Sequence, residues 1–192
     1  MGITSQSIIE KPPLLLSLIV TEKCNLDCVY CFVVDKSDRE MSEEIAFETV
    51  ERYLNSTSPE FDYVQIDFTG GEPLLCFPLI SRVVEHVISG KWLKRFSFSI
   101  GTNGTLITPK IRKWADNYPC VTFALSFDGL QEAHDRNRSN SYKTVMSNID
   151  FFKKWPDAKV KMTIGPDNVD KIPASVKHIH ELGLDVAANV VF

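Results

Sequence analysis

Short apolar runs along the chain alternate with amphipathic stretches that have a helical period. The runs are rich in β-branched and aromatic residues and predict strands at 14–20, 62–68, 96–101, 121–127, 159–164 and 185–192. The stretches between them predict helices at about 42–56, 77–90, 108–117, 142–155 and 173–182. Start signals support several of these helices, including Ser42 before two glutamates and Thr108 before a proline.

Strands and helices that alternate in this way predict a parallel sheet, because right-handed helical crossovers return the chain to the same end of the sheet. The predicted fold class is therefore α/β, with six strands in a partial (βα)6 TIM-like barrel. A complete eightfold barrel needs two further units. No stretch rich in Pro, Gly or Ser divides the chain, so we expect residues 1–192 to form one domain.

The composition is that of an ordinary globular domain, with 44% hydrophobic and 24% charged residues in a chain of 192. A formal net charge of -4 provides neither a basic stripe for nucleic acid nor a polybasic patch for a membrane surface. The first 20 residues lack the pattern of a signal peptide, and their apolar run is too short to span a bilayer. We therefore expect a cytoplasmic protein with neither nucleic acid nor membrane as a partner.

Unusual motifs follow four of the predicted strands, at the end where the loops of a parallel sheet converge. A cluster of cysteines at 24–31 follows the first strand, and TGGEP at 69–73 follows the second. GTNG at 101–104 follows the third strand, and SFDG at 126–129 closes the fourth. The functional site is therefore predicted at this rim of the barrel.

Cys24, Cys28 and Cys31 form the cluster, in a chain with five cysteines. Three thiolates on a short loop can hold three irons of a 4Fe-4S cluster and leave the fourth iron open to a substrate or cofactor. A zinc site is the first alternative, but it needs a fourth ligand, and the histidines are distant in sequence. Three free thiols are the second alternative. Cys76 and Cys120 are interpreted as small buried hydrophobic residues.

The spacing Cys-x3-Cys-x2-Cys, followed by Gly-Gly-Glu-Pro after the second strand, resembles the radical S-adenosylmethionine (SAM) superfamily. TNG at 102–104 and the segment from LSFDG to HDRNR at 125–138 are most similar to the branch of anaerobic sulfatase maturases and other peptide maturases. The resemblance implies two cofactors, a 4Fe-4S cluster on the three cysteines and SAM on its open iron.

The resemblance also implies an activity. An electron from a donor such as flavodoxin or ferredoxin would cleave SAM reductively, and the resulting 5'-deoxyadenosyl radical would take a hydrogen atom from a peptide or protein substrate. A small-molecule enzyme of cofactor biosynthesis is the alternative. A cluster-binding module without turnover of its own is a third interpretation, because the resembled branch carries a C-terminal region with auxiliary clusters. We expect residues 1–192 to be the core domain without that region.

SAM presents an ammonium group and a carboxylate, so its site needs both an acceptor and donors. Glu72 and the backbone at Gly70 and Gly71 are expected to accept from the ammonium, with glycine allowing the main chain to approach the ligand closely. The alternative is a tight turn with an acid at the start of a helix. Asn103 is interpreted as a turn residue.

Other cofactor contacts are implied by the resemblance. They are Ser126, whose hydroxyl lies at a strand end, Arg138, whose guanidinium suits a carboxylate, and Tyr30, which would pack on the adenine. The alternatives are a backbone-bonded serine, a solvated loop arginine and a tyrosine in the core. Asp128 and Gly129 are interpreted as a turn pair. Backbone at 189–191 is expected near the adenine, in a last strand whose uncovered edge favours self-association.

Overall fold

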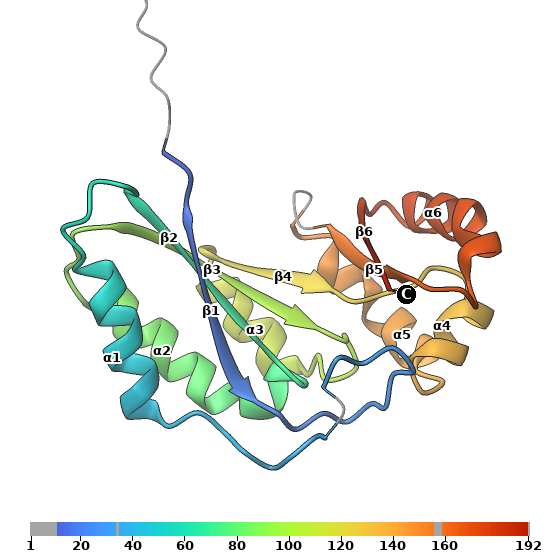
Figure 1. The fold of residues 1–192 in the computed structure, drawn as a ribbon, viewed down its shortest axis with the longest axis horizontal. Helices are drawn as coiled ribbons and strands as arrows, with labels where there is room; N and C mark the ends of the chain where they lie inside the picture. Colours follow the sequence, from blue (N-terminus) through green and yellow to red (C-terminus); the bar gives the residue numbers. More distant parts are fainter. Residues whose placement is uncertain (1–10, 34, 156–158, 192) are drawn as a thin grey trace, which may run out of the picture.

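The computed structural model describes residues 11–33, 35–155 and 159–191, and Figure 1 shows strands and helices alternating along the chain. The strands are β1 Leu14–Thr21, β2 Tyr63–Gly70, β3 Arg95–Thr102, β4 Val121–Leu125, β5 Val160–Ile164 and β6 Val186–Val190. The helices are α1 Glu43–Leu54, α2 Phe77–Ser89, α3 Pro109–Asn117, α4 Gln131–Asn137, α5 Tyr142–Phe152 and α6 Ile172–Glu181. Short 3-10 helices, η1 Pro73–Cys76 and η2 Val169–Lys171, precede α2 and α6.

The strands are parallel and form two sheets, one with the order β1-β2-β3-β4 and one that pairs β5 with β6. A parallel bridge between Ser126 and Lys161 joins the two sheets just beyond β4. Each strand therefore lies beside the next one in sequence, as in a barrel that has not closed. The predicted class, an α/β fold with parallel strands in a partial barrel, is confirmed.

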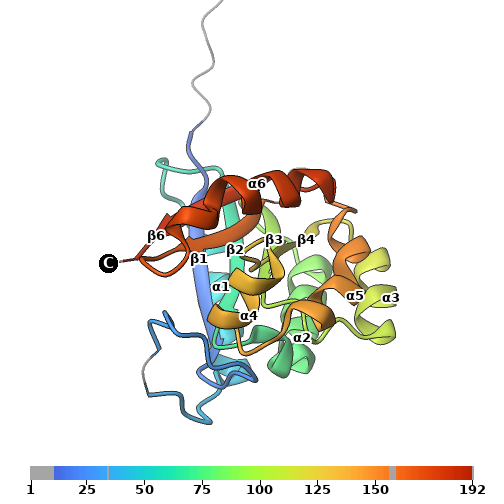
Figure 2. The ribbon, with the colours of Figure 1, turned by 90° about the vertical axis from the view of Figure 1, so that its right-hand side faces the viewer.

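One face of the four-stranded sheet packs in the core and the other is more open. Burial therefore alternates from residue to residue along most of β1 and β2. On the core face Leu18, Phe68 and Phe98 are each at most 1% exposed. Figure 2 shows α2 and α3 on one side of this sheet. The open face carries both polar residues and exposed apolar residues, so the hollow of the partial barrel has a mixed lining. Examples are Gln65 and Asp67 among the polar residues, and Leu15 and Ile19 among the apolar ones.

The predicted boundaries hold for most elements. Ser42 accepts a hydrogen bond from the backbone of Ile45 (3.2 Å) and Thr108 accepts one from Ile111 (3.3 Å), so both are the N-caps that their sequences indicated. The fourth strand was predicted to reach residue 127 but ends at Leu125, because the chain there turns to the second sheet. Helix α4 was not predicted, and residue 192, at the end of the last predicted strand, lies outside the described residues.

Of the helices in the described ranges, none has both the length and the apolar character needed to cross a membrane.

Candidate active site at the carboxyl ends of the strands

A cavity of about 350 Å³ opens where the carboxyl ends of the strands meet. Its wall includes eight of the nine site residues predicted from the sequence: Cys24, Cys28, Tyr30, Cys31, Gly70, Gly71, Ser126 and Arg138. Thr102, Asn103, Lys161, Thr163, Asn189 and Val191 also line it, so the third, fifth and sixth strands contribute as well. A neighbouring cavity of about 380 Å³ touches the same glycine turn but is lined by none of the cysteines.

The loop after β1, residues 22–33, carries the three cysteines and is here called the cysteine loop. It is held by hydrogen bonds to two other loops. Asn25 donates to Thr105 (2.8 Å) beyond β3, while the backbone of Asp27 donates to the hydroxyl of Ser139 (2.8 Å) beyond α4. A further backbone bond joins Val29 to the carbonyl of Asn137 (3.0 Å). The cysteines are therefore presented by a loop fixed from two sides.

The thiols of Cys24 and Cys28 are half-buried, and burial raises the pKa of both. The Arg138 guanidinium opposes this effect on the pKa of Cys28. A metal ligand must be a thiolate, so metal binding here has to displace protons. Among the described residues, no three His, Cys, Asp or Glu side chains converge as the ligands of one metal ion would. The thiols that bind a 4Fe-4S cluster can lie farther apart than the ligands of one metal ion, because each thiolate binds its own iron.

Gly70 and Gly71 bring the end of β2 against the cysteine loop. Gly70 has a φ of 139°, and a Cβ there would lie 2.1 Å from the carbonyl oxygen of Thr21. A Cβ on Gly71 would lie 2.2 Å from the carbonyl oxygen of Lys23. The close approach allows the Gly71 amide to donate to Thr21 and the Glu72 amide to donate to Lys23, both at 2.8 Å. Glycine is therefore required at 70 and 71 by this close backbone contact, in addition to any need for the main chain to approach a ligand in the cavity.

Glu72 is the one predicted site residue that does not line the cavity. Its side chain is fully buried, and its carboxylate accepts hydrogen bonds from the Leu74 amide (3.0 Å), the Thr102 hydroxyl (2.8 Å) and the Asn103 amide (2.8 Å). Burial raises the pKa of Glu72 to about 7, although these hydrogen bonds oppose the shift. The carboxylate therefore ties the turn after β2 to the end of β3, behind the cavity wall.

Asn103 has the turn role that the sequence indicated, and a second contact besides. Its Oδ1 accepts from the backbone of Thr105 (3.0 Å), which is a local turn bond. Its Nδ2 donates to Oδ1 of Asn25 (2.9 Å) in the cysteine loop. Glu72 thus holds Asn103, and Asn103 in turn holds the loop.

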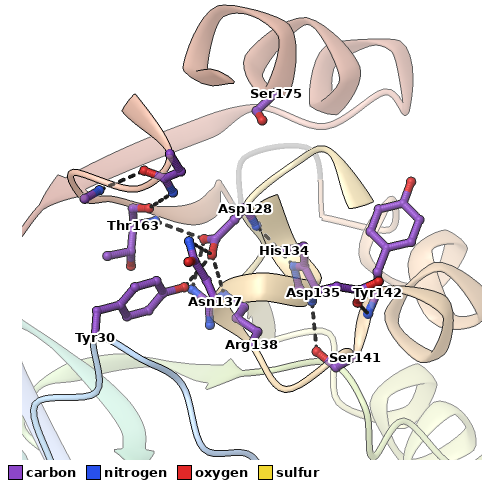
Figure 3. A network of polar contacts seen from close by, with 12 residues as sticks. Tyr30, Asp128, His134, Asp135, Asn137, Arg138, Ser141, Tyr142, Thr163 and Ser175 are labelled. Atoms are coloured by element: carbon purple, nitrogen blue, oxygen red, sulfur yellow. Dashed lines mark hydrogen bonds and ion pairs between the residues drawn. The ribbon is translucent and has the colours of Figure 1, made fainter. Parts of the chain in front are cut away.

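Arg138 and Asp128 form a buried ion pair, which corrects two sequence-based alternatives. Arg138 is only 6% exposed rather than solvated, and Asp128 is 1% exposed rather than a simple turn residue. The Arg138 Nη2 donates to Oδ1 of Asp128 (3.3 Å), while its Nε lies 3.2 Å from Oδ2 without hydrogen-bond alignment. Asp128 also accepts from the hydroxyl of Tyr30 (2.5 Å) and the amide of Thr163 (3.2 Å), as Figure 3 shows.

Tyr30 joins the cysteine loop to this ion pair, because its side chain contacts both members of the pair. The Arg138 guanidinium sits over its ring, 5.2 Å from the centroid. Burial and the Asp128 carboxylate raise the pKa of Tyr30, although the positive charge of Arg138 opposes them, so the hydroxyl stays protonated and donates. The ring lines the cavity, and the hydroxyl is engaged in the network behind it.

His134 supports Asp128 from α4. Its Nδ1 accepts a hydrogen bond from the Asp128 amide (3.3 Å), so its Nε2 carries the proton and donates to Ser141 (2.9 Å). The ring is fully buried, and burial, with Arg138 nearby, lowers the pKa of His134 to about 4. The histidine is therefore neutral at physiological pH and acts in this network rather than as a metal ligand.

Parallel strands that gather three cysteines, a glycine turn and a buried arginine around one cavity define a class of enzyme with a cofactor site at the mouth of a partial barrel. The family model described as the radical SAM superfamily matches residues 18–179. The chain belongs to this superfamily, as the cysteine and Gly-Gly-Glu motifs predicted.

Named relatives place the chain near enzymes of the maturase type. It is 32% identical to the radical SAM cyclopropyl synthase TigE of Paramaledivibacter caminithermalis, over 72% of this chain and 32% of TigE. It is 32% identical to a cysteine-type anaerobic sulfatase-maturating enzyme of Clostridium perfringens, over 75% of this chain and 42% of that enzyme. The solved structure of native anSMEcpe with bound AdoMet and Kp18Cys peptide is similar to this chain with a TM-score of 0.81 and 24% identity, over 94% of this chain and 52% of that chain.

The chain spans between about a third and a half of the length of these proteins. Family membership confirms that the chain comes from an enzyme superfamily that uses a 4Fe-4S cluster and SAM. The residues of the cavity fit these groups, because three thiols and an arginine share one wall with a glycine turn whose main chain is open to the cavity.

Proposed function

We propose that this chain is the core domain of a radical SAM enzyme that modifies a peptide or protein. The observation that carries the proposal is the cavity of about 350 Å³ in which three thiols, a glycine turn and a buried arginine meet. Similarity to TigE and to anaerobic sulfatase-maturating enzymes favours a peptide or protein substrate. The core domain is proposed as residues 1–192, and the longer relatives suggest that the whole enzyme has a further region.

We assign the cysteines and the glycine turn as follows. Cys24, Cys28 and Cys31 would each bind one iron of the 4Fe-4S cluster. The main chain at Gly70 and Gly71 would accept from the ammonium of SAM, since these residues line the cavity. Glu72 does not line the cavity and already accepts from three donors, so we propose that it acts mainly by holding this wall.

Other residues of the cavity wall would bind the rest of SAM. Arg138 keeps one edge of its guanidinium on Asp128 and lines the cavity, where it would attract the SAM carboxylate. Ser126 would donate to the carboxylate or the ribose, and the ring of Tyr30 would pack on the adenine. Asn189 and Val191 line the same cavity, which supports a contact between the backbone at 189–191 and the adenine.

When bound, the cluster and SAM would supply a 5'-deoxyadenosyl radical, with the electron from a donor such as flavodoxin or ferredoxin. The chain itself binds and orients. Gln65 and Asp67, on the open face of the sheet, would present hydrogen-bonding groups to the backbone of a peptide. A substrate held there would lie beside the cavity that holds SAM.

Anaerobic reconstitution with iron and sulfide tests this proposal, followed by measurement of dithionite-driven 5'-deoxyadenosine. Cys24→Ala, Cys28→Ala and Cys31→Ala should each abolish the cluster. Cys76→Ala and Cys120→Ala are matched controls, because both residues lie outside the cavity wall, and they should load iron normally. Equal iron in all five variants would refute the cluster assignment.

A second arm tests the substrate class. Deuterated peptides from a proteome digest should transfer deuterium into 5'-deoxyadenosine, whereas a deuterated pool of nucleosides and free amino acids should not. Transfer from the small molecules alone would favour an enzyme of cofactor biosynthesis. Iron and SAM binding without 5'-deoxyadenosine would favour a binding module that is inactive by itself.

A further inference from the structure

Asp128 connects the cysteine loop to the end of α4 and to β5, and it does not itself line the cavity. Its carboxylate accepts from Tyr30 in the cysteine loop, from Arg138 at the end of α4 and from the Thr163 amide in β5. Asn137 adds a longer bond of 3.5 Å. Figure 3 shows the four donors arranged around this one side chain. Three segments that are distant in sequence are therefore joined at one buried carboxylate.

Tyr30 makes this connection relevant to the cysteines, because it lies between Cys28 and Cys31 in sequence. A hydrogen bond from its hydroxyl to a fully buried acceptor fixes the direction of the side chain. That direction in turn restricts the backbone between two of the three thiols. The same side of the loop is held by the bond from Val29 to Asn137. Asp128 thus acts on the cysteines through Tyr30.

The turn after α4 is shaped to complete this attachment. Ser139 and Asn140 have φ values of 52° and 54°, a left-handed conformation that non-glycine residues adopt only at some cost. In this conformation the Ser139 hydroxyl accepts from the backbone of Asp27 (2.8 Å). The His134 ring, bonded to the Asp128 amide, fixes the Asp128 backbone to the same helix. The end of α4 is therefore built around the cysteine loop.

We infer that Asp128 is a positioning residue that holds the cysteine loop in its ligand-bearing shape through Tyr30, and that it supplies the counter-charge of Arg138. The first role makes the loop slow to open, which retains the cluster. The second role keeps one negative charge beside a buried positive charge at the cavity wall. This inference rests on the proposed function, since it takes the three cysteines to be the cluster ligands.

Two variants separate these roles. Tyr30→Phe removes the hydroxyl but keeps the ring and the Asp128–Arg138 ion pair. Asp128→Asn keeps the shape of the side chain but removes its charge. Tyr142→Phe is the matched control, because it also deletes a half-buried tyrosine hydroxyl bond, to Nε2 of His178 (3.0 Å), away from the cysteine loop.

The first measurement uses metal-free protein, so that it does not depend on the cluster. Hydrogen exchange of the Asp27 and Val29 amides should be faster by about tenfold in Tyr30→Phe than in wild type, the factor expected for loss of one hydrogen bond. Tyr142→Phe should leave these amides unchanged. The second measurement is release of iron to a chelator after reconstitution, which should be faster in Tyr30→Phe by a similar factor.

The third measurement is the midpoint potential of the cluster by electron paramagnetic resonance. Asp128→Asn should shift it to a more positive value, because losing a buried negative charge favours the more negative reduced cluster, whereas Tyr30→Phe should shift it little. Exchange and iron release in Tyr30→Phe equal to those in Tyr142→Phe would overturn the positioning role. An unchanged potential in Asp128→Asn would overturn the counter-charge role. If Asp128→Asn does not fold, Tyr30→Phe still decides the positioning role.

These outcomes are distinct from failure of the proposed function. A wild-type chain that binds no iron, together with fast exchange in Tyr30→Phe, would refute the cluster and leave the loop attachment standing. A wild-type chain with a normal cluster, together with unchanged exchange and iron release in Tyr30→Phe, would refute the attachment and leave the function standing.

Discussion

Replacing Glu72 with alanine tests whether this carboxylate supports the cavity wall or serves a ligand directly. The side chain is fully buried and accepts from three donors, on Leu74, Thr102 and Asn103. A buried donor left without its acceptor costs about 1 to 3 kcal/mol. Losing all three bonds should therefore lower the free energy of unfolding by at least about 3 kcal/mol, a large part of the about 5 to 15 kcal/mol typical of a domain.

The contribution of Glu72 to stability should depend on pH, and the sign of this dependence follows from its pKa. Burial raises the pKa of Glu72 from an ordinary 4.5 to about 7 in the folded protein. A raised pKa means that the folded state binds the proton more tightly, so the contribution to stability is full below pH 4.5 and is lost as the pH rises through 7. The shift corresponds to about 3 kcal/mol. The side chain of Glu72→Gln does not titrate. The free energy of unfolding of this variant, relative to that of wild type, should therefore rise by about that amount between pH 4.5 and 8.

The assay is urea unfolding of the metal-free protein at several pH values, followed by circular dichroism. Glu48→Ala is the matched control, because Glu48 is an exposed glutamate on α1, and it should change the stability by less than about 0.5 kcal/mol. SAM affinity is measured in parallel by calorimetry on reconstituted protein. A loss of stability below about 1 kcal/mol in Glu72→Ala at pH 4.5, where the Glu72 contribution is still full, together with weaker SAM binding, would refute the structural role and favour direct contact of Glu72 with the ammonium.

Three further predictions concern other parts of the chain. Gly71→Ala should sharply lower iron uptake, because its Cβ would lie 2.2 Å from the backbone of Lys23, whereas Gly165→Ala, whose Cβ would lie 3.4 Å from its nearest neighbour, should load iron normally. The pKa of His134 is lowered from 6.5 to about 4, so its contribution to stability is present above pH 6.5 and lost as the pH falls through 4; His134→Gln should remove this acid-dependent loss in unfolding curves. Exposed β6 pairs only with β5 among the described strands, so light scattering should show self-association, which a monodisperse monomer would contradict.

The alternation of strands and helices could be predicted because each element carries its own period and boundary signals. Helix α4 could not, because Gln131–Asn137 has a single apolar residue, Ala133, and so no amphipathic stripe. That helix is held by tertiary contacts, such as the hydrogen bond from Val29 to the Asn137 carbonyl and the ion pair of Glu132 with Lys171. The role of Asp128 was only weakly indicated by the sequence, in which it is an acid just after a buried strand, on the rim that carries the other motifs.

The sequence by itself determined the superfamily, the parallel fold and the rim where the cysteines and the glycine turn meet. Motif spacing and the alternation of strands and helices along the chain are both properties of the sequence itself. Only the tertiary structure decided which way each side chain faces. It buried Glu72 behind the wall that Gly70 and Gly71 form, and it paired Arg138 with Asp128. The bonding partners of Glu72 at the end of β3 lie tens of residues away in sequence, and the partner of Arg138 lies across a chain reversal. No hydrophobic period encodes either kind of contact, so both form only when the barrel folds.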